Sequence, residues 1–179
     1  MYEFSHDWFS SNIPGFSRHL AHLRDKPCTA LEIGSYEGRS AVWLLDNILT
    51  NEQSRLTCID IFEQPLLSTN LKSSSGSHKT QFILGASARI LKTLPLRFFD
   101  FVYIDGFHGQ VEVLEDAVLS FRLAKTGAMI CFDDYAWNDP KLNRHGTPKI
   151  AIDAFLNIYN KKIDIVDVGY QIWIRKKSE

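Results

Sequence analysis

Short runs of apolar residues alternate along the chain with longer segments whose apolar positions have helical spacing. Five runs predict β-strands, at residues 28–33, 55–60, 80–84, 99–105 and 128–133. The segments between and after them predict helices at 38–50, 64–72, 86–93, 109–124 and 148–160. Several strands are apolar almost throughout, which is typical of strands buried on both faces of a parallel sheet. The pattern therefore predicts a doubly wound α/β domain.

The two ends of the chain depart from this alternation. Residues 162–168 and 170–176 both alternate as strands, and Gly169 alone separates them, so we expect an antiparallel C-terminal hairpin. With it, the prediction is a Rossmann-like seven-stranded sheet, mostly parallel, in three layers (α/β/α). Residues 1–27 have apolar positions at mostly helical spacing, interrupted by Pro14 and Gly15, and predict a helical cap. We expect one domain over 1–179, with its core in 28–179.

Composition and charge narrow the class of protein. Apolar residues make up 45% of the 179 residues and charged residues 23%, close to the globular average, which disfavours disorder. The formal charge of −1 gives no reason to expect nucleic acid as a partner. Cys28, Cys58 and Cys131 lie apart in apolar stretches, as buried thiols do in a reducing compartment. Neither a leader nor a membrane span is expected, so the predicted location is the cytoplasm.

In open α/β sheets, ligands bind beyond the carboxyl ends of the strands. After the first strand comes EIGSYEGRS, Glu32 to Ser40, in which Gly34 and Gly38 permit a tight turn and close backbone approach. It is not the dinucleotide fingerprint, because Ser35 and Tyr36 follow Gly34 where a second glycine is needed. The turn is predicted to hold the polar backbone of a ligand, or else merely to join strand to helix.

The next two strand ends suggest a nucleoside site. Asp60 ends the second strand, where its carboxylate can accept both hydroxyls of a ribose, while Ile61 and Phe62 supply an apolar wall for the base. After the third strand, Gly85 to Ser87 offers a close-approach glycine and a hydroxyl near that base. The alternatives are that Asp60 is a helix cap or a solvated carboxylate and that Ser87 is a helix N-cap.

Three carboxylates and one imidazole follow the fourth and fifth strands. YIDGFH gives Asp105 and His108, and FDDY gives Asp133 and Asp134. Such a cluster needs a compensating positive charge, for which magnesium is the first candidate because its preferred ligands are oxygens. Without a metal, these carboxylates would cap a strand and loop or orient a ligand. His108 is either a general base or a histidine packed in its loop.

The ordered set EIGSYEGRS, CID, GAS, YIDGFH and FDDY, followed by the terminal hairpin, resembles a class I S-adenosylmethionine-dependent methyltransferase. The resemblance is to the small-molecule O-methyltransferase-like branch that carries YIDGxH and DDY motifs, and it covers essentially the whole chain. It implies that Glu32 and the glycine turn hold the methionine part of the cofactor, Asp60 the ribose, and Phe62, Ala86 and Ser87 the adenine. The full set of cofactor residues that we expect is Glu32, Gly34, Ser35, Tyr36, Gly38, Ser40, Asp60, Phe62, Ala86, Ser87 and Asp105.

The resemblance also implies a metal site and a catalytic base. In metal-dependent catechol-type relatives, an Asp after the fourth strand and an Asp-Asn pair after the fifth bind magnesium, and these positions are Asp105, Asp133 and Asp134 here. Aspartate in place of asparagine at 134 adds negative charge and increases the need for a cation. Where catechol-type enzymes have a lysine base, this chain has His108, whose imidazole titrates near neutrality.

The expected function is transfer of a methyl group from S-adenosylmethionine to a hydroxyl on a small molecule or sugar, assisted by Mg²⁺. Two alternatives stay open. One is a module that binds S-adenosylmethionine or a metal without transferring a methyl group, and the other is a nicotinamide-dependent oxidoreductase, which the missing second glycine and the terminal hairpin disfavour. In the loop 136–148, Trp137 either stacks on a ligand ring or packs, and His145 is an alternative base.

Overall fold

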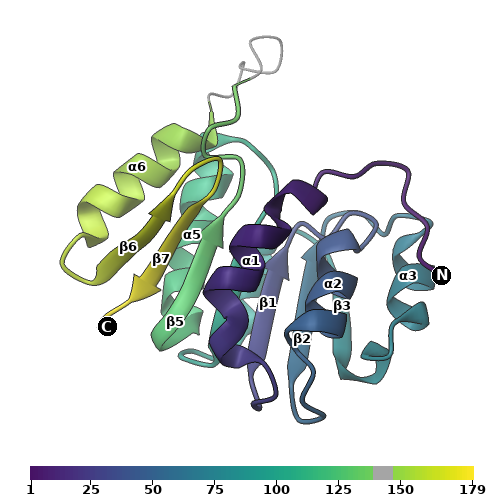
Figure 1. The fold of residues 1–179 in the computed structure, drawn as a ribbon. Helices are drawn as coiled ribbons and strands as arrows, with labels where there is room; N and C mark the ends of the chain where they lie inside the picture. Colours follow the sequence, from purple (N-terminus) through teal and green to yellow (C-terminus); the bar gives the residue numbers. More distant parts are fainter. Residues whose placement is uncertain (139–146) are drawn as a thin grey trace.

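The computed structural model describes residues 1–138 and 147–179. Its centre is one seven-stranded sheet in the order β3-β2-β1-β4-β5-β7-β6 (Figure 1). The strands are β1 (Thr29–Ile33), β2 (Arg55–Asp60), β3 (Thr80–Leu84), β4 (Phe99–Ile104), β5 (Ala124–Phe132), β6 (Ile163–Val168) and β7 (Ile172–Lys176). All seven predicted strands are present. The fifth begins at Ala124 rather than 128, because Ala124 already pairs with Phe99 of β4. The register shifts before Met129 pairs with Phe101, and Gly127 lies in this irregular stretch with a φ of 90°.

Helices cover both faces of this sheet, as predicted. They are α1 (Ile13–Leu20), α2 (Arg39–Asn47), α3 (Leu67–Ser73), α4 (Ser87–Ile90), α5 (Gln110–Leu123) and α6 (Pro148–Tyr159), with short 3-10 turns at Ser10–Asn12, Ala21–Leu23, Ser77–Lys79 and Leu91–Thr93. In Figure 1, α1 and α2 lie in front of the sheet and α5 behind it. One buried cluster joins α1, α2 and α3 to the sheet, and a second joins it to α4, α5 and α6. Within the described residues, every helix is too short or too polar to span a bilayer.

The N-terminal segment differs from the predicted helical cap. Pro14 and Gly15 do not interrupt α1, because proline is tolerated in the first turn of a helix, where its missing N–H leaves no hydrogen bond unmade. Phe16 anchors α1, since its fully buried ring packs edge-on against Phe101 and Trp173 of the sheet. Residues 1–9 contain no helix and run as an extended strap. Figure 1 shows this strap passing from beside α3 over the top of the sheet to the start of α1.

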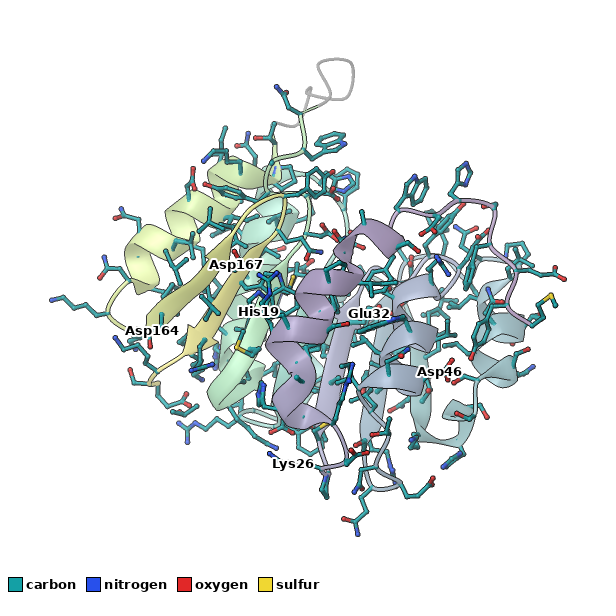
Figure 2. The ribbon with its side chains drawn as sticks, viewed as in Figure 1. His19, Lys26, Glu32, Asp46, Asp164 and Asp167 are labelled. Carbon is teal, nitrogen blue, oxygen red and sulfur yellow. The ribbon has the colours of Figure 1, made fainter. Side chains whose placement is uncertain are left out.

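The C-terminal hairpin is confirmed, with one addition to its topology. β7 lies between β5 and β6 and is antiparallel to both. The amino end of β7 therefore lies at the edge of the sheet where β5 has its carboxyl end. His19 of α1 points to Asp167 of β6, with 2.8 Å between Nε2 and Oδ2, and this contact fastens the hairpin to the front layer (Figure 2).

The position of β1 in the sheet determines where a ligand can bind. β1 pairs with β2 on one side and with β4 on the other. Successive strands are therefore added toward one edge of the sheet up to β3 and toward the other edge from β4 onward. At such a reversal the connections from neighbouring strands leave to opposite faces and open a crevice at the carboxyl ends. Gly34, which follows β1, and Asp105, which follows β4, lie side by side at this point. The three cysteines are buried free thiols, as expected.

Candidate active site

The turn after β1 is held tightly against the loop after β4. Gly34 has a φ of 86°, and a Cβ atom built on it would lie 1.9 Å from the carbonyl oxygen of Asp105. Because the obstructing atom is backbone, no side-chain movement makes room for a larger residue. The amide of Asp105 donates to the carbonyl of Ile33 at 2.8 Å, which fixes the two loops together. Glycine at position 34 is therefore required by this close approach and by the backbone conformation.

Asp60 supports the same turn from the end of β2. Its Oδ2 accepts hydrogen bonds from the backbone amides of Ser35 and Tyr36, at 2.9 and 2.8 Å. Its Oδ1 accepts from the amide of Phe62 at 3.0 Å. A carboxylate has about four lone-pair positions, so Asp60 retains capacity for a ligand hydroxyl. The structure thus gives Asp60 a role in shaping the turn, and its contact with a ribose stays a prediction.

These residues line a large cavity at the carboxyl edge of the sheet, with a volume of about 1090 Å³. Such a volume accommodates a nucleoside cofactor together with a small second substrate. Of the predicted cofactor residues, those that line it are Gly34, Ser35, Tyr36, Ser40, Asp60, Phe62, Ala86, Ser87 and Asp105. The cavity continues past Asp105 to the tips of β4 and β5, where His108, Asp133, Asp134, Trp137 and Tyr170 line it. One space therefore connects the two predicted halves of the site.

Glu32 and Gly38 are the two predicted cofactor residues that do not line the cavity. Glu32 is fully buried in the sheet layer (Figure 2), where its Oε1 accepts a hydrogen bond from the Ser40 hydroxyl at 2.5 Å. Burial raises the pKa of Glu32, and its Oε2 has no partner among the described residues. Gly38 occupies the N-cap position of α2 with a φ of 81°. Both residues shape the turn from behind. Ser87 is not an N-cap, because Ala86 holds that position in α4.

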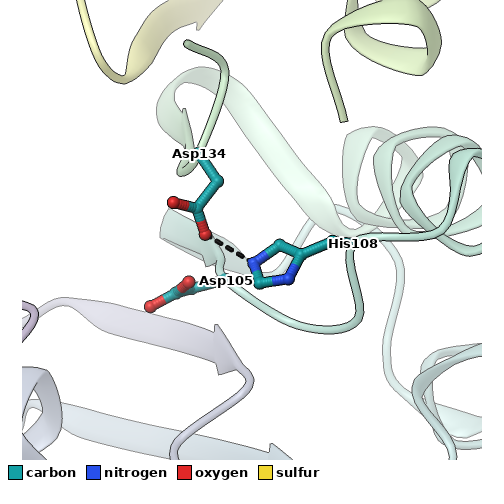
Figure 3. A group of neighbouring side chains, drawn as sticks. All are labelled: Asp105, His108 and Asp134. Carbon is teal, nitrogen blue, oxygen red and sulfur yellow. Dashed lines mark hydrogen bonds and ion pairs between the residues drawn. The ribbon is translucent and has the colours of Figure 1, made fainter. Parts of the chain in front are cut away.

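At the tips of β4 and β5, three side chains converge. Ligand atoms of Asp105, His108 and Asp134 all lie within 4.8 Å of one another (Figure 3). Nε2 of His108 is 2.6 Å from Oδ2 of Asp134, and the hydroxyl of Tyr170 donates to Oδ1 of Asp134 at 2.6 Å. Burial opposes ionisation of Asp134, but the hydrogen bonds from His108 and Tyr170 outweigh it and lower the pKa of this carboxyl. Asp134 is accordingly ionised and held in place.

Asp133, the third predicted metal ligand, lies outside this group of three side chains. Its Oδ2 accepts hydrogen bonds from Asn12 at 3.1 Å, from Gln171 at 3.0 Å and from the hydroxyl of Tyr103. Its Oδ1 accepts from the amide of Asp134 at 2.8 Å. Adjacent residues after a strand point their side chains in different directions. Asp133 thus ties β4 to the residues that directly precede α1 and β7, and His108 is the third member of the cluster.

The hydroxyl of Tyr103 links Asp105 to Asp133. The Tyr103 hydroxyl lies 3.0 Å from Oδ2 of Asp105 and also contacts Oδ2 of Asp133. A phenol has one hydrogen, so only one of these contacts can use it, and the other requires a protonated carboxyl. Burial, together with the charges of Asp133 and Asp134, holds the pKa of Asp105 well above its usual range. Asp105 is therefore the carboxyl that carries a proton when no cation is near.

The strap supplies a wall of the cavity that sequence reasoning missed. Its lining residues are Phe4, His6, Asp7, Trp8 and Phe9. Buried Glu37 accepts hydrogen bonds from the amide and hydroxyl of Ser5, at 2.7 and 2.8 Å, and buried Asn70 pairs with the backbone of Glu3. No periodic pattern marks this segment as a wall. Tyr170 was also missed, although the predicted antiparallel hairpin places the start of its second strand at an end of the sheet.

The loop after β5 is described as far as residue 138. The indole of Trp137 stacks on the imidazole of His108, with 4.8 Å between ring centroids and 20° between planes. Trp137 therefore packs on the histidine while still lining the cavity. His145, the alternative base, lies outside the described residues.

Comparison with known proteins agrees with this geometry. A family model described as a methyltransferase domain matches residues 31–135, while no curated protein matches the chain by sequence. The O-methyltransferase TomG from Streptomyces achromogenes, which is involved in tomaymycin synthesis, has a similar structure in complex with S-adenosylmethionine. The TM-score is 0.73 at 21% identity, over 94% of this chain and 81% of TomG.

Two further structures show how widely this fold is used. The MycE methyltransferase of the mycinamycin biosynthetic pathway, in complex with Mg, S-adenosylhomocysteine and mycinamycin VI, gives a TM-score of 0.68 at 16% identity, over 97% of this chain and 50% of MycE. A proposed rRNA methylase from Clostridium thermocellum gives 0.77 at 14% identity, over 94% and 97% of the two chains. Because one of these proteins is described in complex with mycinamycin VI and the other as an rRNA methylase, the likeness shows a shared fold and does not identify an acceptor.

Proposed function

Because this chain belongs to the family of methyltransferase domains, we propose that it transfers a methyl group from S-adenosylmethionine to a hydroxyl of a small molecule. One observation carries the proposal. A single cavity joins the glycine turn and Asp60, which suit a nucleoside amino acid, to the His108 and Asp134 pair, which suits proton removal. Two substrates bound in the two halves would meet beside Asp105.

The cofactor half of the cavity fits S-adenosylmethionine. Gly34 lines the cavity without a side chain, and the hydroxyl of Ser35 is buried without a partner among the described residues. Asp60 has lone pairs left for a ribose hydroxyl, and the exposed ring of Phe62 offers a flat surface for adenine. When bound, the cofactor supplies a methyl group already activated by its sulfonium, so the protein has mainly to align the acceptor and remove a proton.

The cluster at the tips of β4 and β5 fits a hard divalent cation. Asp105 and Asp134 would hold it, because carboxylate oxygens are the ligands that Mg²⁺ prefers, and Mg²⁺ usually takes only one or two of them from the protein. Bound there, the ion would supply a positive charge that lowers the pKa of a coordinated acceptor hydroxyl. Asp133 stays outside this set, because its oxygens are engaged by protein donors.

His108 is the proposed proton acceptor. Its Nε2 faces Asp134, which stabilises the imidazolium that forms when the ring takes a proton. Tyr170 steadies Asp134 from the other side, and Trp137 holds the plane of the ring. Because Asp134 and Trp137 hold His108 in position, little additional free energy is needed to orient the imidazole in the transition state.

The test separates cofactor binding from catalysis. S-adenosylhomocysteine should bind in a calorimeter, and labelled S-adenosylmethionine should mark at least one member of a panel of hydroxylated metabolites. His108→Gln should lower turnover by about 10²- to 10⁴-fold and leave cofactor affinity nearly unchanged. His78→Gln is the matched control, since His78 also pairs with a carboxylate, 2.9 Å from Glu52, but is not among the residues lining the cavity. Parent-like turnover by His108→Gln would remove His108 from the reaction, and binding without any turnover would favour a non-catalytic module.

A further inference from the structure

The cavity is lined by many acidic residues and by one arginine, and this imbalance indicates where an anionic group of a ligand can bind. The acidic lining residues are Asp7, Glu37, Asp60, Asp105, Glu112, Asp133 and Asp134. Among the lining residues that the structure describes, Arg39 is the only lysine or arginine. S-adenosylmethionine carries a carboxylate on its amino-acid tail, and a carboxylate that loses water needs a charged or hydrogen-bonding partner. The tail ammonium has many acidic groups available, whereas the tail carboxylate has one cation.

Arg39 is well placed for that carboxylate. It is the first residue of α2, directly after the glycine turn, where the partial positive charge of the helix start also favours an anion. Its Nε and Nη2 donate to the two carboxylate oxygens of Asp7, at 2.8 and 2.9 Å, and Nη2 also contacts the hydroxyl of Ser10. Nη1 makes no hydrogen bond to any residue that the structure describes, and the side chain is 32% exposed.

On the basis of the proposed function, we propose that Arg39 binds the carboxylate of the cofactor's amino-acid tail through Nη1. A guanidinium has five N–H donors in a planar fork, so the Nε and Nη2 edge can hold Asp7 while the Nη1 edge holds the ligand. Asp7 also fixes the guanidinium in advance, which reduces the rotamer entropy lost when the ligand binds.

This arrangement couples the cofactor to the strap. Asp7 belongs to the strap, and the guanidinium of Arg39 also lies over the ring of Phe4, 4.8 Å from its centroid. A ligand that immobilises Arg39 therefore immobilises the strap contacts made by the same group. Since the strap lines the cavity, we expect the cofactor tail to stabilise the strap in the position it has in this structure, and a nucleoside that lacks the tail not to do so.

Two ligands separate this role from a structural one. S-adenosylhomocysteine has the amino-acid tail, whereas 5′-methylthioadenosine is the same nucleoside thioether without it. In calorimetry, Arg39→Met should weaken S-adenosylhomocysteine binding by about 10- to 100-fold, the range for losing a hydrogen bond between charged groups. Its affinity for 5′-methylthioadenosine should stay within about threefold of the parent, which also shows that the variant is folded. Arg18→Met, at a surface ion pair outside the cavity, is the matched control.

Each outcome decides one claim. Equal losses for both ligands would make Arg39 structural, and no loss for either would remove it from the site. If the parent binds neither ligand, the proposed function fails first. Hydrogen exchange of residues 2–9 gives the second readout: S-adenosylhomocysteine should slow it and 5′-methylthioadenosine should not. Asp7→Asn should abolish this difference while retaining most of the S-adenosylhomocysteine affinity, and an unchanged difference would refute the coupling.

Discussion

Replacing Asp116 with asparagine should flatten the pH dependence of stability. Asp116 lies on α5 behind the site, only 2% exposed, with its Oδ2 next to Gly106 and its Oδ1 without a partner among the described residues. Burial raises its pKa to about 6 from an ordinary 3.8, in opposition to a hydrogen bond from Ser87. The folded protein therefore binds a proton at Asp116 more readily than the unfolded chain does.

The sign and size follow from proton linkage. Between the two pKa values the folded state holds more protons, so the free energy of unfolding falls as pH rises. The contribution is greatest below the unfolded value and has disappeared once pH exceeds the folded value of about 6. From pH 5 to pH 8 the loss spans about one pKa unit, which corresponds to about 1.4 kcal/mol. Asparagine cannot titrate, so it removes this loss.

Urea unfolding at pH 5, 6, 7 and 8 measures the effect. The informative quantity is the difference in unfolding free energy between parent and Asp116→Asn, because groups that titrate in both proteins cancel. Altered hydrogen bonding in the variant adds an offset at every pH and does not change the slope. We expect the difference to shift by about 1.4 kcal/mol in favour of the variant from pH 5 to pH 8. Parallel profiles would refute the assignment of a raised pKa to Asp116.

Three further predictions concern the site. Gly34→Ala should abolish S-adenosylhomocysteine binding and lower the melting temperature, because the new methyl group meets the backbone of Asp105; normal binding in calorimetry would contradict the close approach. Asp60→Asn should weaken S-adenosylhomocysteine binding by about 1.5 to 3 kcal/mol, and unchanged affinity would exclude a ribose contact. Mn²⁺ or Mg²⁺ should raise the melting temperature of the parent and of Asp153→Asn, an exposed control, but not of Asp134→Asn. A parent indifferent to both ions would leave no metal site.

The pattern of apolar residues predicted the sheet well, because burial on two faces leaves a clear trace in sequence. The strands that end at Ile33, Asp60 and Ile104 sit where the apolar runs place them. The C-terminal hairpin could be predicted from the length of the connection between its strands, because a single residue cannot form a crossover. These features depend on local sequence, which is why they could be predicted without knowing the strand order.

The detailed site could not be predicted to the same extent. The sequence does not distinguish the adjacent Asp133 and Asp134. In the structure, Asp133 accepts hydrogen bonds from several protein donors, whereas Asp134 pairs with His108. Their difference depends on Asn12 and Gln171, which come from opposite ends of the chain and meet at Asp133 only in the folded protein. The conformation of the strap could not be predicted for a related reason. Its conformation depends on distant Glu37 and Asn70 rather than on a periodic pattern of its own.

The insertion of β7 between β5 and β6 separates the assembly of the site into two stages. Among the strands that the structure describes, β7 is the only sheet neighbour of β6, so although the ribosome makes β6 first, β6 can join the sheet only through β7 and its pairing with β5. That pairing also delivers Gln171 to Asp133 and Tyr170 to Asp134. A nascent chain that ends after β5 already contains the glycine turn and Asp60 but lacks both of these partners. We therefore expect the ability to hold a nucleoside to arise earlier in biosynthesis than the ability to catalyse.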